Sequence, residues 1–270
     1  MSEANTLFGN AVADGTLSSE TANTINFDDL GETINDALGV SVDDVTASEV
    51  VLVTMLIDDS GSIRFAGNTD AVRTGHNVVL DALGKSKQDD SIIVMCRYLN
   101  GTQLYPYMPL KQATRMDAGN YNPNGGTPLY DESITTLGAV IAKSQDFLDN
   151  GIACRTVTLI VTDGADAGSY RDAPDVKRFV SDMLRAENHI VAFMGIFDGQ
   201  KDANGNPIPG TGTDFEQVAT EMGIPKEWIL TPGNTESEIR KAFAVFSQSA
   251  QRASQNATAF SQQAMGGFGA

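Results

Sequence analysis

Five oxygen-bearing side chains stand in three short segments of the sequence, each of which follows or precedes an apolar run. They are Asp58, Ser60 and Ser62 in the first segment, Thr127 in the second and Asp163 in the third. Carboxylates and hydroxyls are hard donors, and the set contains no sulfur and no imidazole. The residue types therefore predict a divalent cation site that suits Mg²⁺, with Mn²⁺ or Ca²⁺ as alternatives, and they argue against Zn²⁺.

The charge of this set limits what a bound cation would do. If the three neutral hydroxyls contact the ion while Asp58 and Asp163 act partly through water, the ion keeps most of its electrophilic character. We expect an Asp or Glu of a second protein to complete the shell of such an ion. Asp59 adds a further carboxylate inside the first segment, which would either reduce this electrophilic character or recruit a second cation.

Short apolar runs rich in β-branched residues alternate with longer amphipathic runs from about residue 49 onward. Strands are predicted at 50–57, 91–99, 103–109, 156–161, 189–197 and 228–230. Helices are predicted at 68–83, 127–148, 174–188 and 213–222, and from about 235. This alternation predicts an α/β fold with a doubly wound, mostly parallel sheet flanked by helices. Ligands of such sheets bind outside the carboxyl ends of the strands, where the polar segments are expected to lie.

Three regions differ in composition. They are a polar N-terminal extension at 1–47, one domain at 48–250 and a low-complexity C-terminal tail at 251–270, which we expect to be mobile. The extension carries a weakly amphipathic stretch whose apolar residues recur at helical spacing. These residues, with the one that precedes the stretch, are Phe27, Leu30, Ile34 and Leu38. Disorder and docking to a partner both remain open for the extension.

The composition is acidic, because 18 Lys and Arg stand against 35 Asp and Glu, for a net charge of −17. Phosphate backbones and anionic membrane surfaces repel such a chain on average, which argues against nucleic-acid and membrane partners. No apolar run approaches the roughly 18 residues of a membrane helix. The first ten residues lack the features of a secretory signal, so we expect a cytoplasmic protein in which Cys96 and Cys154 are free thiols.

The polar segments carry a family resemblance. Asp58-x-Ser60-x-Ser62, together with Thr127 and Asp163, resembles the metal-ion-dependent adhesion site (MIDAS) of von Willebrand factor A (vWA) domains. The resemblance covers about residues 48–250 and includes a Gly-Gly-Thr before the middle helix and a Thr-Asp-Gly after the fourth strand. It implies a doubly wound sheet with the ion at its top edge, and protein binding rather than catalysis. The chain is also similar to cytoplasmic bacterial single-domain proteins of tellurium-resistance operons, which implies a role in stress response.

Two other functions remain open. A Mg²⁺-dependent phosphatase of the haloacid dehalogenase type also places an Asp after its first strand, but Ser60 stands where that family has its second Asp. His76 and His189 are expected to be structural, and no phosphate-binding glycine loop follows a strand. Alternatively, the chain is an assembly protein in which the ion only stabilises loops.

The surface around the ion is expected to select the partner. Three loops are candidates for it, at 117–124, 165–172 and 198–212. Tyr121 and Tyr170 are the candidate contact aromatics in these loops, since aromatic side chains are enriched at protein interfaces.

Overall fold

A sheet of six strands forms the centre of the computed structural model, which describes residues 3–24, 27–86, 89–203, 208, 210–255 and 265–268. The strands are β1 (Glu49–Ile57), β2 (Ile92–Tyr98), β3 (Gln103–Pro109), β4 (Ala153–Thr162), β5 (His189–Gly195) and β6 (Ile229–Leu230). Their order is β3-β2-β1-β4-β5-β6, and only β3 runs antiparallel to its neighbour. The predicted fold class, a doubly wound and mostly parallel sheet, is confirmed.

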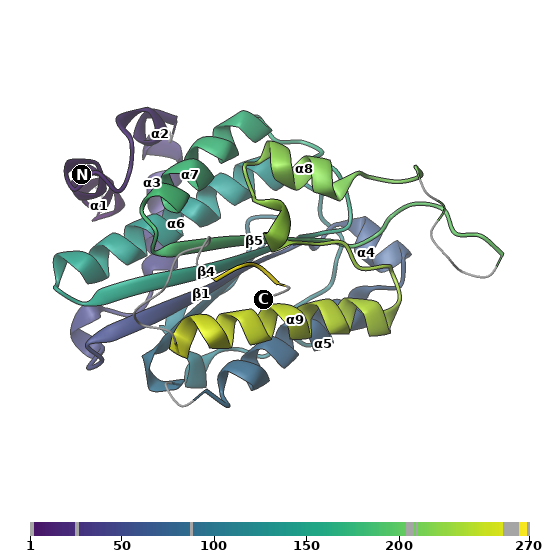
Figure 1. Cartoon of the computed structure of the whole chain (residues 1–270), viewed down its shortest axis with the longest axis horizontal. Helices are drawn as coiled ribbons and strands as arrows, with labels where there is room; N and C mark the ends of the chain where they lie inside the picture. The colour runs from purple at the N-terminus through teal and green to yellow at the C-terminus, as the bar shows by residue number, and fades with distance from the viewer. Residues whose placement is uncertain are drawn as a thin grey trace.

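The α-helices cover both faces of this sheet. They are α1 (Glu3–Ala13), α2 (Ser19–Thr24), α3 (Phe27–Leu38), α4 (Gly61–Phe65), α5 (Thr69–Leu83), α6 (Leu129–Asp149), α7 (Ala173–Arg185), α8 (Phe215–Glu221) and α9 (Glu236–Gln255). Helices α6, α7 and α8 lie on one face, and α5 and α9 lie together on the other (Figure 1). Gly75 of α5 allows this close approach, because a methyl group there would come within 2.1 Å of the Phe243 ring of α9.

The strand order reverses at β1, which lies between β2 and β4. Every residue of β1 after Glu49 is buried, as expected for a strand covered on both faces. The parallel register places Ile57 beside Val161 of β4 and Tyr98 of β2, so the three strands end at one level. The loops that follow them therefore meet at the switch point, where ligands of this fold class bind.

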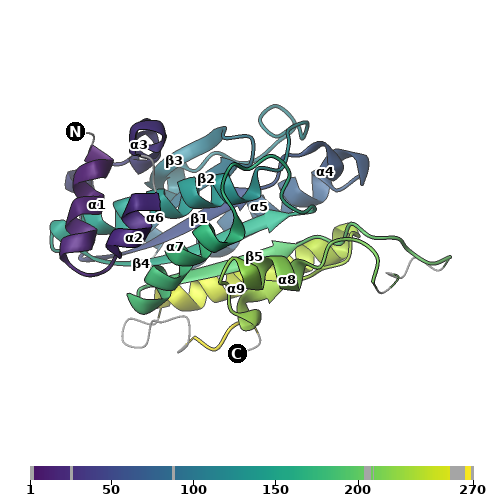
Figure 2. The same ribbon diagram turned by 90° about the horizontal axis from the view of Figure 1, so that it is seen from above.

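The N-terminal residues are folded against this core. Figures 1 and 2 show α1, α2 and α3 grouped over the outer side of α6 and α7. Phe8 and Ile34 are buried and lie over Gly138 of α6, which has no side chain to keep them away. Lys143 of α6 is also buried, and its ammonium group donates to the Val40 carbonyl at 2.6 Å.

Disorder is therefore the wrong alternative for the described part of the extension. Two of its apolar residues, Ile34 and Leu38, are buried in the protein's own core rather than exposed for a partner. The side chain of Phe27 lies outside the described residues. Helix α1 was not predicted, although its buried residues Ala4, Leu7, Phe8 and Ala11 recur at helical spacing. The predicted limits of the domain, 48–250, stay a prediction.

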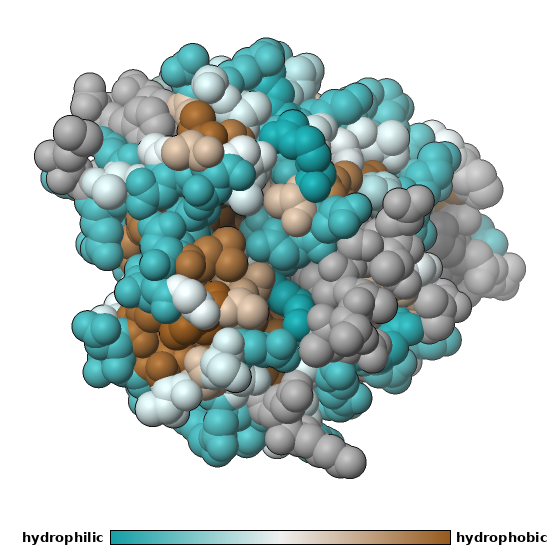
Figure 3. All heavy atoms as spheres, turned by 60° about the vertical axis from the view of Figure 1, so that its left-hand side comes forward, coloured by the Kyte–Doolittle hydropathy of each residue, from teal (hydrophilic) through white to brown (hydrophobic). Residues whose placement is uncertain are grey.

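The C-terminal tail is partly folded as well. Met265 is buried, and the Phe268 ring packs edge-on against Trp228 with the ring centroids 5.2 Å apart. The expected mobility is wrong for 265–268, whereas 256–264 lies outside the described residues. In the described part of the chain, no helix is both long and apolar enough to cross a membrane. Figure 3 shows the left-hand side of Figure 1, where hydrophilic residues cover much of the surface and hydrophobic residues gather in a broad patch at the lower left and in smaller patches elsewhere.

Both cysteines and both histidines are buried in the core. Cys96 and Cys154 are free thiols, as predicted. His76 Nε2 lies 2.9 Å from the Tyr105 hydroxyl, and His189 Nδ1 lies 2.8 Å from the Thr156 hydroxyl. Burial lowers the pKa of His76 to about 4 and that of His189 to about 3, so both imidazoles are neutral at pH 7. These packed, uncharged rings are structural.

Burial of Phe8 predicts that the N-terminal helices contribute to global stability. We expect Phe8→Ala to lower the free energy of unfolding by about 3–5 kcal/mol, because it removes a buried ring and leaves a cavity over α6. Urea unfolding measures this change. Thr6→Ala, on the exposed side of the same helix, is the control. A Phe8→Ala protein as stable as the control would contradict the packing of α1.

The pKa of His189 predicts a pH-dependent stability. Its folded pKa lies below the ordinary value of 6.5, so below pH 6.5 the unfolded chain binds the proton more readily and the stabilising effect of the neutral ring is lost. The cost of His189→Gln should therefore be smaller at pH 5 than at pH 7.5, by about 2 kcal/mol. Denaturant titrations at the two pH values measure it. Val191→Ala, in the same strand, should cost the same at both, and an equal pH dependence for the two variants would refute a neutral His189.

Candidate metal centre

Asp58 is the most buried residue of the predicted site. It follows β1 directly, and its side chain is inaccessible to solvent. One carboxylate oxygen accepts the Ser60 backbone N–H at 2.7 Å, and the other accepts the Thr162 hydroxyl at 2.7 Å. The Asp163 N–H also points to this second oxygen, at 3.3 Å. Asp58 therefore joins the ends of β1 and β4 with charge-assisted hydrogen bonds.

A short chain of oxygens runs from this carboxylate toward solvent. The hydroxyls of Ser60 and Ser62 lie 2.8 Å apart, and the Ser62 hydroxyl donates to Asp163 Oδ1 at 2.6 Å. Ser60 and Asp163 are buried, whereas Ser62 is exposed. Adjacent ligands of an octahedral Mg²⁺ lie about 3 Å apart, given Mg–O distances of about 2.1 Å. The spacing and the hard donors of this cluster therefore fit a small divalent cation.

The Gly-Gly-Thr segment reaches the same edge through its backbone. The Gly125 carbonyl accepts the Gly61 N–H at 3.1 Å, beside the bridge between Ser60 and Gly125. Thr127 lies two residues further, is largely buried, and accepts the Ala167 N–H through its carbonyl at 2.8 Å. Direct contacts thus link the four Asp and Ser residues of the prediction, and backbone pairing brings Thr127 to the same edge.

Asp59 connects the loops around the candidate site, and its expected effect on a bound ion stays a prediction. Its carboxylate accepts the Asn100 N–H at 2.9 Å, and its carbonyl accepts the N–H groups of Asn124 and Gly125 at 2.8 and 2.9 Å. It therefore ties the first polar segment to the loop after β2 and to the Gly-Gly-Thr segment. Burial raises its pKa to about 6, and the charge of Asp58 adds to this effect. Within the described ranges, no group of three or more Asp, Glu, His or Cys residues is placed to share an ion, either at this edge or elsewhere, so a cation at the candidate centre would depend on hydroxyl donors as well.

The electrostatics of Asp163 favour a cation. Burial raises its pKa to about 7, the Ser62 hydroxyl opposes this, and the charges of Asp58 and Asp198 raise it further. Two buried carboxylates at one edge repel each other and are poorly solvated. A divalent cation at this edge would supply the missing positive charge. The arrangement thus has the electrostatic character of a metal site as well as its donors.

Tyr121 supports the site from beneath. The sequence predicted a surface aromatic, and this is wrong, since the side chain is completely buried. Its hydroxyl donates to the Asp58 carbonyl at 2.5 Å, and its ring packs on that of Tyr98. Arg73 holds the loop by donating to the Tyr121 carbonyl at 2.6 Å. Thr162 also supports the site, because its hydroxyl donates to the Asp58 carboxylate. Its place in the Thr-Asp-Gly segment is the sequence feature that could have indicated this role.

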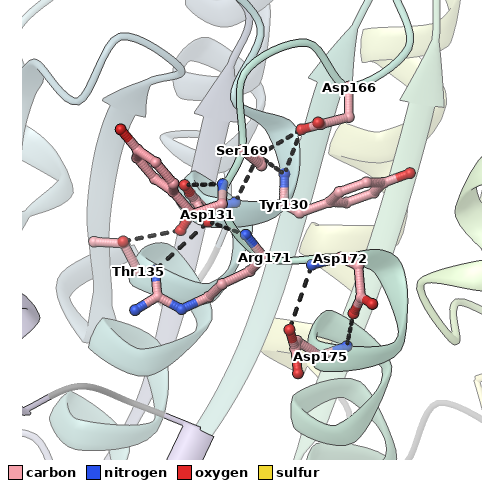
Figure 4. Close-up of polar contacts among 9 residues, drawn as sticks. Tyr130, Asp131, Thr135, Asp166, Ser169, Arg171, Asp172 and Asp175 are labelled. Carbon is pink, nitrogen blue, oxygen red and sulfur yellow. Dashed lines mark hydrogen bonds and ion pairs between the residues drawn. The ribbon is translucent and has the colours of Figure 1, made fainter.

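The loop at 165–172 is fixed on the first turn of α6 (Figure 4). The Ser169 hydroxyl accepts the N–H groups of Tyr130 and Asp131, both at 3.1 Å, and donates to Asp166. Asp131 accepts in turn the N–H groups of Tyr170 and Arg171, at 2.9 and 3.0 Å. The predicted exposure of Tyr170 is confirmed, because 99% of its side chain is accessible.

Comparisons with known proteins place the fold but not the family. No family profile matches the sequence, and no curated protein matches it either. Two crystal structures of the pilus adhesin SpaC from Lactobacillus rhamnosus GG match 76% and 75% of this chain, with 14% and 12% identity and TM-scores of 0.52 and 0.53. The vWF domain of the pilus tip protein Mfa5 from Porphyromonas gingivalis matches 78% of this chain and 98% of its own, with 11% identity and a TM-score of 0.49.

The chain spans about a third of the SpaC adhesin, 30% and 31% in the two structures. Likeness at this level of identity shows the architecture alone. The class of protein defined here is therefore a doubly wound α/β domain with a hydroxyl and carboxylate cluster at its switch point.

Removal of the Tyr121 hydroxyl tests the support beneath the site. Tyr121→Phe leaves the buried Asp58 carbonyl without its donor, so we expect the free energy of unfolding to fall by about 1–3 kcal/mol. Denaturant unfolding measures the loss. Tyr170→Phe removes a hydroxyl in solvent and should change stability by less than about 0.5 kcal/mol. Equal stabilities of the two variants would show that the hydrogen bond to Asp58 contributes nothing.

Proposed function

We propose that this chain is a vWA-type domain that binds one divalent cation and uses it to bind a protein partner. The ligands in this proposal are Asp58, Ser60, Ser62, Thr127 and Asp163, with the aspartates acting partly through water. The observation that carries the proposal is a hydrogen-bonded chain of oxygens at the switch point of the sheet. It runs from the Ser60 hydroxyl through the Ser62 hydroxyl to the Asp163 carboxylate. Mg²⁺ is the proposed ion, and Mn²⁺ and Ca²⁺ share its preference for these donors.

The charge count supports adhesion through the ion. The two carboxylates of the proposed shell carry two formal negative charges, which equal the charge of a divalent cation. Both oxygens of Asp58 also accept hydrogen bonds, so this carboxylate neutralises the cation less effectively. A bound cation would supply Lewis acidity toward an external carboxylate. Ser62 is the exposed member of the cluster and marks the side from which a partner's Asp or Glu approaches. The net charge of −17 favours a protein partner over nucleic acid or an anionic membrane.

The geometry gives no support to phosphoryl transfer. A phosphatase of the type considered above needs an accessible Asp as its nucleophile, but Asp58 is fully buried and both of its carboxylate oxygens accept hydrogen bonds. Both histidines are buried, and their lowered pKa values make them weak bases at pH 7, so neither is suited to act as a general base. A non-enzymatic role is therefore part of the proposal. A cytoplasmic location and a kinship with the tellurium-resistance proteins, both expected from the sequence, complete it.

Metal titration and affinity capture test this proposal together. Calorimetry should show one Mg²⁺ site in the wild-type protein and an affinity at least about tenfold lower in Thr127→Ala. Capture from the source cell should retain partners in Mg²⁺ and release them in EDTA, and Thr127→Ala and Asp58→Ala should fail to retain them. Each variant removes one donor of the proposed shell.

The control is Ser181→Ala, which removes an exposed hydroxyl on α7 and should match the wild type in both measurements. Retention of the same partners in EDTA and by every variant would contradict adhesion through the ion. If Mg²⁺ binds and raises the melting temperature without affecting capture, the ion only stabilises the loops, as in an assembly protein.

A further inference from the structure

Exposed large hydrophobic side chains occur at the edge of the sheet that carries the candidate metal centre. Large hydrophobic residues of the described chain are exposed at four positions: Phe65 (81%), Tyr170 (99%), Leu148 (37%) and Ile208 (36%). Phe65 ends α4, just after β1, while Tyr170 and Ile208 lie in the segments that follow β4 and β5. Leu148 lies at the opposite edge, shortly before β4 begins. Three of the four exposed residues thus lie in segments that follow the carboxyl ends of strands.

Phe65 and Tyr170 lie on two sides of the Gly-Gly-Thr segment. Backbone bridges pair Gly125 with Ser60 on one side and Thr127 with Ala167 on the other. Phe65 is five residues beyond Ser60, and Tyr170 is three residues beyond Ala167. The two aromatic residues therefore flank the segment that brings Thr127 to the site.

The Phe65 ring is held close to the first polar segment. It lies against Gly61, where a methyl group would be 3.4 Å from a carbon of the ring. The Arg64 guanidinium stacks on the ring at 5.0 Å from its centroid and donates to Asn124 Oδ1 at 3.1 Å. Arg64 thus bridges the ring to the residue that precedes the Gly-Gly-Thr segment. A ring fixed in this way loses little entropy when a partner covers it.

The backbone of Tyr170 is held by a hydrogen bond, whereas its side chain is exposed. Its N–H donates to Asp131 Oδ2, and the neighbouring Ser169 caps the first turn of α6. Figure 4 shows this set of contacts between the loop and the helix. A tyrosine presents a large, stiff surface with few rotatable bonds, which is the usual character of an interface anchor. None of the described residues covers this side chain, so its apolar surface is available to a partner.

The charge around the site limits the partner further. Asp117 and Asp198 are exposed in the loops of the same edge. A partner with an extended acidic surface would be repelled here, whereas a single carboxylate can be compensated by the ion. The fitting partner therefore carries one acidic residue in apolar surroundings.

We infer that Phe65 and Tyr170 are specificity-determining anchors for a protein loop that presents one Asp or Glu between apolar side chains. This inference rests on the proposed function, because the acidic residue of the loop binds the cation. The two aromatic residues would then grip the apolar side chains on either side of it. They contribute affinity and selectivity for the partner and leave the metal shell unchanged.

Peptide selection provides the test. A displayed library of random 12-residue peptides with a fixed central Asp is selected on the full-length protein in Mg²⁺ and eluted with EDTA. We expect the selected peptides to be enriched in aromatic and aliphatic residues near the Asp. A synthetic copy of a selected peptide should bind Phe65→Ser and Tyr170→Ser about 10- to 30-fold more weakly than wild type. Leu148→Ser is the matched control and should bind like wild type.

Calorimetric Mg²⁺ titration of each variant separates this inference from the proposed function. Both aromatic variants should bind Mg²⁺ as wild type does, which also shows that they are folded. Peptides that depend on Mg²⁺ but carry no apolar enrichment, or that bind all variants equally, would overturn the anchors and leave the metal-dependent adhesion intact. Failure to select any peptide eluted by EDTA would overturn both.

Discussion

A fully buried carboxylate at the end of the central strand is the constraint on which the edge of this sheet depends. Asp58 cannot be solvated, so its charge must be satisfied by donors from the surrounding chain. Those donors come from the segment after β1 and from the end of β4. The same hydrogen bonds that stabilise the charge also fix Ser60 and Asp163 relative to each other. Burial of one side chain therefore produces the geometry of the whole cluster.

Local pattern was sufficient to predict the layers of the core. The strands and the helices that pack on them have long, strongly periodic apolar runs, and their predicted limits agree with the structure to within a few residues for most elements. The positions of the candidate site residues relative to the sheet could also be predicted, because these residues stand close to the end of a strand or the start of a helix. Parallel strands of a doubly wound sheet end at one edge, so the residues that follow them lie close together. The juxtaposition of Asp58 and Asp163 therefore follows once the fold class is known.

Residues whose role depends on tertiary contacts were not predictable. Tyr121 lies in a polar loop and has no local pattern that indicates burial, yet the loop folds back and places its hydroxyl under Asp58. The sequence did not indicate that the Asp59 carboxylate accepts the Asn100 N–H, or that its carbonyl accepts the N–H groups of Asn124 and Gly125. The apolar spacing of α1 could have indicated a helix, but its docking site over Gly138 of α6 depends on a residue far away in the sequence. Each failure concerns a partner that is distant in sequence.

Segments near both ends of the described chain contact the two outer sides of the sheet. Beside β3, the Val40 N–H donates to the Tyr107 carbonyl, and just before β6 the Phe268 N–H donates to the Glu227 carbonyl. An open edge offers unpaired backbone groups to the strands of other molecules and so promotes aggregation. Each of these contacts places a segment of the chain itself beside an outer strand, where it hinders the approach of a strand from another molecule.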